Sequence, residues 1–195
     1  MRTAFNTVKR SKGYSVSEVT EFFDTARSAY EKHDRTFDSV RIQNASFSLE
    51  KGGYETTSVD SALDRLTVAM EAQRKEDILI IKDESAWNEY RVESTKALTG
   101  RIERPAGKRF KLGTEKEPAY AIAEVDALLD KIGVFLKVQT DGGRSLSRKE
   151  LRDGLQAEDI TKAVFTGVKG EKGYEEKSVD AFLAAAFVVY AILIV

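Results

Sequence analysis

The stretch Gly173-Tyr174-Glu175-Glu176-Lys177-Ser178-Val179-Asp180-Ala181-Phe182-Leu183 decides how this chain folds. A valine lies five positions after the tyrosine, and a large apolar residue lies nine positions after it. The last two are four residues apart, so they share one face of a helix. If the residue after the tyrosine is the helix N-cap, the tyrosine and the valine form a hydrophobic staple. The stretch therefore predicts a tight turn leading into an amphipathic helix.

The same spacing occurs four times along the 195 residues, at unequal intervals. Self-similarity of this kind indicates a recurring structural unit. The tyrosine and valine pairs that would form the four staples are Tyr14 and Val19, Tyr54 and Val59, Tyr120 and Val125, and Tyr174 and Val179.

Short stretches of β-prone residues precede the turns, at 5–9, 46–50, 109–112 and 164–168. In the first copy, Ser15 and Glu18 have the identities of a capping box. We therefore expect a helix-dominated α+β fold of four repeats. Each repeat would consist of a short strand or hairpin, a Gly-Tyr turn and a stapled helix.

Apolar periodicity predicts the extent of the helices. The longest is expected at 56–102, because no glycine or proline interrupts the sequence from Thr56 until Gly100. The turn residues at 104–107 indicate a boundary, which gives two domains: 1–103 with repeats one and two and the long helix, and 104–195 with repeats three and four. The other helices are expected near 15–33, 121–138 and 175–195, with short helical turns near 147–153 and 157–163.

The composition limits the chemistry of the chain. It has 31 Lys+Arg against 32 Asp+Glu, so it has no strong overall field to attract nucleic acid or membrane. The absence of cysteine excludes disulfides, thiol catalysis and thiolate-bound metals. The single histidine, His33, excludes mechanisms that need two imidazoles. The sequence therefore predicts no enzymatic activity, no cofactor and no metal site.

The pattern of Gly-Tyr, four residues, Val-Asp, one residue and Phe-Leu resembles the repeat of the DivIVA family, the bacterial proteins that organise the cell pole and septum. The segment 157–165 ahead of Gly173-Tyr174 is similar to the segment that precedes the family's motif. Four copies in one chain resemble the multi-repeat DivIVA-domain proteins. The resemblance covers about half of the chain.

The resemblance implies a cytoplasmic, non-enzymatic scaffold or adaptor that self-associates through helices, including coiled coils, and acts in cell division or polar growth. Its partners would be further copies of itself and unidentified division or envelope-growth proteins, at the septum or pole on the inner membrane face. In the family, a turn just before Gly-Tyr contacts the membrane. The matching positions here include Lys12, Lys51 and Lys172, and none of the four copies has an aromatic residue there.

Basic residues suggest an alternative function. The segment 101–111 has five positive charges and one negative charge, and a second basic group lies at 9–12. Such residues could contact an anionic membrane surface or nucleic acid, or could simply be a solvated surface. Nucleic acid is the less favoured partner. The candidate contact residues are Lys9, Arg10, Lys12, Arg104, Lys108, Arg109 and Lys111.

The last predicted helix has no charged residue from Ala181 to Val195. That segment would span roughly 22 Å as a helix, less than the ~30 Å hydrocarbon core of a bilayer. An apolar surface of this extent must be covered by the chain's own core, by a second chain or by lipid. We expect the end of this helix to mediate self-association. The residues predicted to do so are Phe187, Val188, Tyr190, Ile192 and Leu193.

Overall fold

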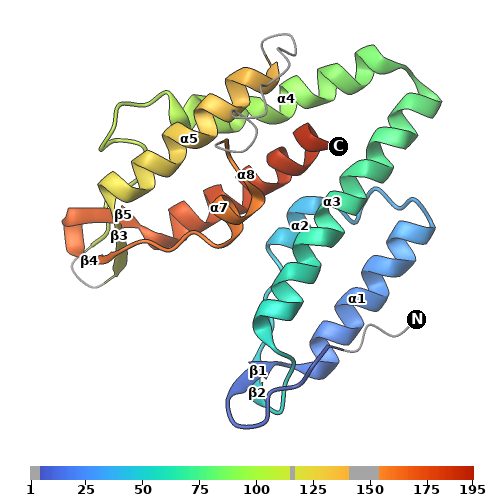
Figure 1. Ribbon diagram of the computed structural model, residues 1–195, viewed down its shortest axis with the longest axis horizontal. Helices are drawn as coiled ribbons and strands as arrows, with labels where there is room; N and C mark the ends of the chain where they lie inside the picture. Colours follow the sequence, from blue (N-terminus) through green and yellow to red (C-terminus); the bar gives the residue numbers. More distant parts are fainter. Residues whose placement is uncertain (1–4, 115–116, 141–153) are drawn as a thin grey trace. The chain divides into compact units, whose positions relative to one another are not determined.

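The computed structural model describes residues 5–114, 117–140 and 154–195. Helices dominate it, and two small antiparallel sheets accompany them, in agreement with the expected α+β class (Figure 1). The chain divides between Asp77 and Ile78 into two compact units. Here the first is called unit 1 and the second unit 2. The predicted helical turn at 147–153 lies outside the described residues.

Unit 1 holds the first two tyrosines of the repeat pattern. Strands β1 and β2 pair antiparallel, with Lys12 opposite Lys51 and Tyr14 opposite Leu49. Helices α1 and α3 start next to this sheet and lie side by side (Figure 1). The elements in chain order are β1 (Lys12–Tyr14), α1 (Val16–Glu31), α2 (Ser39–Gln43), β2 (Leu49–Lys51) and α3 (Thr56–Ile81), of which the last turn belongs to unit 2.

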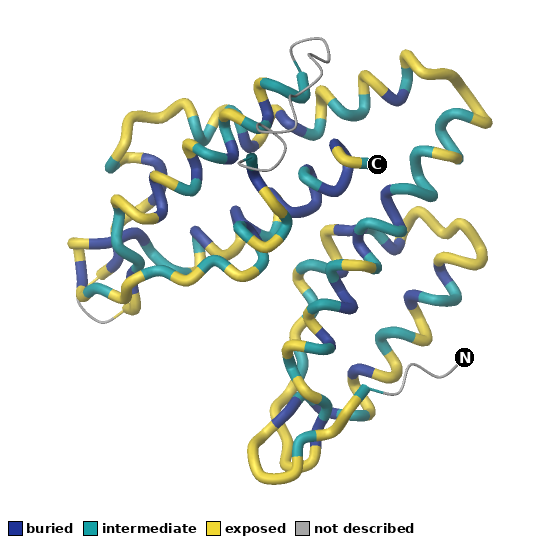
Figure 2. The backbone as a smooth tube through the Cα atoms, viewed as in Figure 1, coloured by how far each residue is buried: buried dark blue, intermediate teal, exposed yellow. Residues whose placement is uncertain are grey.

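The core of unit 1 forms between these helices. Val19 of α1, Ile42 of α2 and Val59 of α3 have no exposed surface. The buried faces of α1 and α3 are visible in Figure 2. The apolar residues at i and i+4 in each helix therefore point inward, as the spacing in the sequence predicts.

Unit 2 holds the other two tyrosines. Its sheet has the order β4-β3-β5 with every pair antiparallel, and Tyr120 lies opposite Tyr174. The elements are α4 (Glu84–Ile102), β3 (Pro118–Ala121), α5 (Ile122–Thr140), α7 (Ala157–Thr161), β4 (Gly167–Lys169), η1 (Gly170–Lys172), β5 (Gly173–Glu175) and α8 (Glu176–Ile194).

Helix α8 lies in the core of unit 2 and packs against α4, α5 and α7. Most of its positions are buried (Figure 2). Of the three covers that the sequence allows for this apolar helix, the structure shows the chain's own core, because α4, α5 and α7 pack against α8.

The predicted helix at 56–102 is two helices rather than one. Asp83 adopts an extended conformation and its carboxylate accepts a hydrogen bond from the backbone N–H of Ala86. It is therefore the N-cap that starts α4, since an aspartate at this position satisfies a free N–H of the first turn. Helix α4 packs against α5 and α8, which explains why the division falls at 77/78 and not at 103/104.

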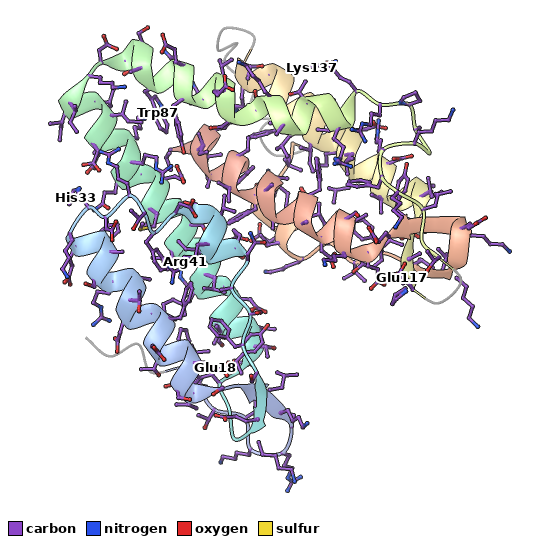
Figure 3. The ribbon with its side chains drawn as sticks, turned by 180° about the vertical axis from the view of Figure 1, so that it is seen from behind. Glu18, His33, Arg41, Trp87, Glu117 and Lys137 are labelled. Carbon is purple, nitrogen blue, oxygen red and sulfur yellow. The ribbon has the colours of Figure 1, made fainter. Side chains whose placement is uncertain are left out.

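The strands also differ from the prediction. Strands β1, β3 and β5 contain three of the four tyrosines, whereas Tyr54 forms only isolated bridges. The predicted stretches 46–50 and 164–168 overlap β2 and β4, and the other two stretches contribute only bridges, at Thr7 and Leu112. The predicted capping box of α1 is absent: Ser15 is the N-cap but makes no capping hydrogen bond. Glu18, labelled in Figure 3, instead accepts a hydrogen bond from the backbone N–H of Ser48.

Candidate functional site

The two tyrosines of unit 1 meet at a bridge beside its two-stranded sheet. Tyr14 and Tyr54 exchange two backbone hydrogen bonds of 2.9 and 2.8 Å. Gly13 and Gly53 allow this approach, because a Cβ atom at Gly13 would lie 2.2 Å from the carbonyl oxygen of Tyr54. The glycine before each of these tyrosines is therefore needed because the two chain segments cross too closely for a side chain.

The same arrangement occurs in unit 2, where Tyr120 and Tyr174 are paired. In both units a phenylalanine from one segment packs on the tyrosine of the other, at centroid distances of 5.1 to 5.4 Å. These pairs are Phe5 with Tyr54, Phe47 with Tyr14, Phe110 with Tyr174 and Phe165 with Tyr120.

A backbone hydrogen bond accompanies each aromatic pair. The residue after each tyrosine donates to the carbonyl of the residue after the partner phenylalanine. The distances are 2.8 to 3.0 Å. The four donor and acceptor pairs are Ser15 and Ser48, Glu55 and Asn6, Ala121 and Thr166, and Glu175 and Lys111.

Three tyrosine hydroxyls bond to an aspartate on the helix of the opposite segment. Tyr174 donates to Asp126 at 3.0 Å, and hydrogen bonds also join Tyr14 to Asp60 and Tyr120 to Asp180. Each aspartate directly follows the valine of the pattern. In the place of a fourth aspartate, after Val19, the chain has Thr20.

Burial is the main cause of the pKa shifts at these pairs. It raises the pKa of Tyr120 to about 12, with the charges of Asp180 and Glu176 adding to the effect. Burial also raises the pKa of Asp180, although its residue surface is largely exposed and the hydrogen bond from Tyr120 opposes the shift. The raised pKa of Tyr120 favours the neutral tyrosine, which is the form that can donate the hydrogen bond.

Arg109 is not a surface residue, so its predicted contact with an anionic surface is wrong. The residue is 6 % exposed, and its guanidinium pairs with Asp126 and Asp130. Its backbone N–H donates to the hydroxyl of Tyr174. Arg109 thus completes the buried polar cluster around Tyr174, and its charge is already compensated.

The other cations of the 101–111 segment also face inward in part. Arg101 lies over the ring of Phe110, and both Arg101 and Arg104 donate to the carbonyl of Arg109. Arg104, Lys108 and Lys111 are exposed, and Lys111 lies 3.9 Å from Glu175. The segment that looked most basic in the sequence therefore offers few free charges.

The second predicted basic group is open to solvent. Lys9, Arg10 and Lys12 are exposed at the end of the unit 1 sheet. The register places Lys51 directly opposite Lys12, which adds a cation that the sequence prediction did not include among its contact residues. Over the described residues none of the four forms an ion pair. We call these four residues the basic tip.

The residues predicted to mediate self-association are largely inside the chain. Phe187, Val188, Ile192 and Leu193 are at most 7 % exposed. The ring of Tyr190 stacks on Phe135. The reason for expecting self-association through this helix is thereby removed, and whether the chain self-associates stays a prediction.

Within the described residues, α8 is also the one helix that could cross a membrane by length and composition. Half of its most apolar window is buried inside the protein. The same described part of the chain contains no group of three side chains suited to holding a metal ion.

Comparison of the chain with protein-family models, with curated proteins and with solved structures gives no match.

Proposed function

We propose that this chain is a four-repeat scaffold or adaptor related in architecture to DivIVA-domain proteins. Its task would be to organise the division or polar-growth machinery on the cytoplasmic face of the membrane, without catalysis. The observation that carries the proposal is the recurrence of one contact set around all four tyrosines. An aromatic ring, a backbone pair and a buried valine surround each of them.

The recurrence supports repeats that work in pairs. Within each unit, two copies complete each other: each supplies the phenylalanine and the backbone acceptor that the other's tyrosine segment needs. A single copy would leave these groups unpaired. A scaffold of two such pairs presents two similar surfaces, which suits a protein that joins others.

The basic tip is the part we propose to contact the membrane. Lys9, Arg10, Lys12 and Lys51 are exposed and unpaired within the described residues. Cations near an anionic lipid surface contribute about 1 kcal/mol each. Four of them would give weak, salt-sensitive attraction without insertion of an aromatic wedge.

Two measurements test the proposal. A fluorescent fusion in dividing cells should concentrate at septa or poles; a uniform cytoplasmic signal would reject the scaffold function. Separately, the protein should co-sediment with phosphatidylglycerol vesicles at low salt and not with phosphatidylcholine vesicles.

The vesicle assay has a matched control. The quadruple variant Lys9→Gln, Arg10→Gln, Lys12→Gln and Lys51→Gln should lose binding. The variant Lys108→Gln, Lys111→Gln, Lys169→Gln and Lys172→Gln removes the same charge from exposed sites of unit 2 and should keep it. Equal loss in both variants would mean that net charge, and not the basic tip, attracts the protein.

A further inference from the structure

Helix α4 has an outward face with a regular charge pattern. Its inner face buries Trp87, Thr95 and Leu98, and Trp87 is labelled in Figure 3. On the other side, exposed charged residues follow one another every seven positions, with alternating sign. They are Lys82 just before the helix, Glu89 and Lys96 within it, and Glu103 at its C-cap.

These residues share one stripe. A spacing of seven is close to two helical turns, so Glu89, Lys96 and Glu103 lie one above the other. Lys82 precedes the extended N-cap Asp83 and joins them through the hollow that it shares with Glu89 and Lys96. Lys82, Glu89, Val92 and Lys96 together line a shallow hollow of about 680 Å³. Val92 is 48 % exposed and lies between Glu89 and Lys96 on the stripe.

The alternation of charge makes the stripe complementary to itself in one orientation only. When two copies lie antiparallel about an axis between Val92 and Glu93, Glu89 of each meets Lys96 of the other. In the same register, Lys82 meets Glu103. A parallel arrangement in register places like charges opposite each other, which is unfavourable.

We propose that a second copy of this chain docks antiparallel on the outward face of α4. The inference rests on the proposed scaffold function and gives it a self-association surface other than α8. Exposed ion pairs contribute only about 0.2–1 kcal/mol each. The dimer is therefore weak, concentration-dependent and disrupted by salt.

Charge reversal with rescue tests the register. Sedimentation velocity of the full chain at low salt should show a dimer that dissociates at high salt. Glu89→Lys alone and Lys96→Glu alone each place like charges at two symmetric contacts, and should lower the association constant about tenfold. The double variant Glu89→Lys, Lys96→Glu exchanges the two charges, so opposite charges meet again and the association constant should return to the wild-type value. Circular dichroism checks that every variant is folded, which matters because Lys96 also pairs with Glu93.

Cross-linking gives a second measurement. The chain has no cysteine, so Val92→Cys introduces a single thiol close to the proposed axis. It should form a disulfide-linked dimer under mild oxidation. The control Val164→Cys, at a residue 91 % exposed in the segment between α7 and β4, should not.

A monomeric wild type, a double variant that stays monomeric, or equal cross-linking of the two cysteine variants would each overturn the proposal. A fusion that localises at septa while the protein is monomeric rejects this surface and leaves the scaffold function standing. A dimer that shows the predicted charge rescue, in a protein that does not localise at septa, supports this surface and rejects the scaffold function.

Discussion

The hydroxyl of Tyr174 donates a hydrogen bond to the carboxylate of Asp126, 48 residues earlier in the chain, at 3.0 Å. Both side chains are buried, and the bond joins β5 to the first turns of α5. Asp126 also accepts from the backbone N–H of Gly107 and pairs with Arg109. The tyrosine that the sequence assigns to a local staple thus also ties together two segments that are distant in the chain.

Tyr174→Phe should lower the stability of unit 2, because it removes the hydroxyl from a buried carboxylate. A lost buried hydrogen bond of this kind costs about 1–3 kcal/mol. The fluorescence of Trp87, the single tryptophan, follows unfolding of unit 2 in denaturant. Tyr54→Phe is the matched control, followed by circular dichroism, and should change stability less. Equal losses would mean that the Asp126 contact contributes nothing of its own.

Tyr120 should make unit 2 sensitive to alkali. Its pKa is about 12 in the fold against an ordinary tyrosine pKa of 10.0, so between these values the folded state keeps a proton that the unfolded state has lost. The contribution is fully present below pH 10 and is lost as pH rises toward 12. In Tyr120→Phe this part of the alkaline loss should disappear. If the wild type and Tyr120→Phe lost stability in parallel between pH 10 and 12, the alkaline loss would not come from Tyr120.

Local sequence patterns predicted where helices begin but not which segments meet. The Gly-Tyr and valine spacing places helix starts near 15, 56, 121 and 175, and the helices begin at Val16, Thr56, Ile122 and Glu176. Capping and amphipathic spacing act within a few residues, so one repeat contains the necessary information. The pairing of Tyr120 with Tyr174 depends on contacts across more than fifty residues, which no local pattern contains.

The candidate site shows the same limit at Arg109. A run of basic residues in a loop indicates a solvated patch, because charges are usually exposed. Here the carboxylates of Asp126 and Asp130 lie beside the guanidinium and compensate its burial. One feature of the sequence could have indicated the burial of Arg109. An aspartate follows the valine of the pattern in three of its four occurrences, and such a recurring acidic residue predicts a polar partner within the fold.

Gly53→Ala should destabilise unit 1. A Cβ atom at this position would lie 2.5 Å from the carbonyl oxygens of Gly13 and Tyr14, which are backbone atoms that cannot move aside cheaply. We expect a loss on the order of 2 kcal/mol or more, within the range for severe strain. Gly167→Ala, where an added Cβ meets nothing within 4 Å, is the control and should change stability little. Circular dichroism in denaturant compares the two, and an unperturbed Gly53→Ala would show that the strands need not approach so closely.

Arg109→Met should unfold unit 2 far more easily than Lys108→Met. Removing the guanidinium leaves the buried Asp126 carboxylate without its cation, which typically costs about 3–5 kcal/mol. Lys108 is exposed, and a surface substitution there should stay within about 0.5 kcal/mol. The midpoint of denaturation by Trp87 fluorescence distinguishes the two. If Arg109→Met were as stable as Lys108→Met but bound anionic vesicles less well, Arg109 would be a surface contact after all.

Thr20→Asp should stabilise unit 1, because it supplies the aspartate that three other copies of the pattern have. Thr20 is exposed, follows Val19, and now bonds only the carbonyl of Val16 in its own helix, at 2.6 Å. By analogy with the other three tyrosine–aspartate pairs, we expect a carboxylate there to accept a hydrogen bond from the hydroxyl of Tyr54. The gain expected from one such hydrogen bond is about 0.5–1.5 kcal/mol.

An aspartate near the start of α1 also interacts favourably with the helix dipole, so the gain must be separated from that effect. The double variant Thr20→Asp, Tyr54→Phe does so. If the new carboxylate acts through Tyr54, its stabilisation should vanish when the hydroxyl is absent, as measured by circular dichroism in denaturant. A gain that survives in the double variant assigns the effect to the dipole alone and places Tyr54 outside the hydroxyl–carboxylate pattern of the other three tyrosines.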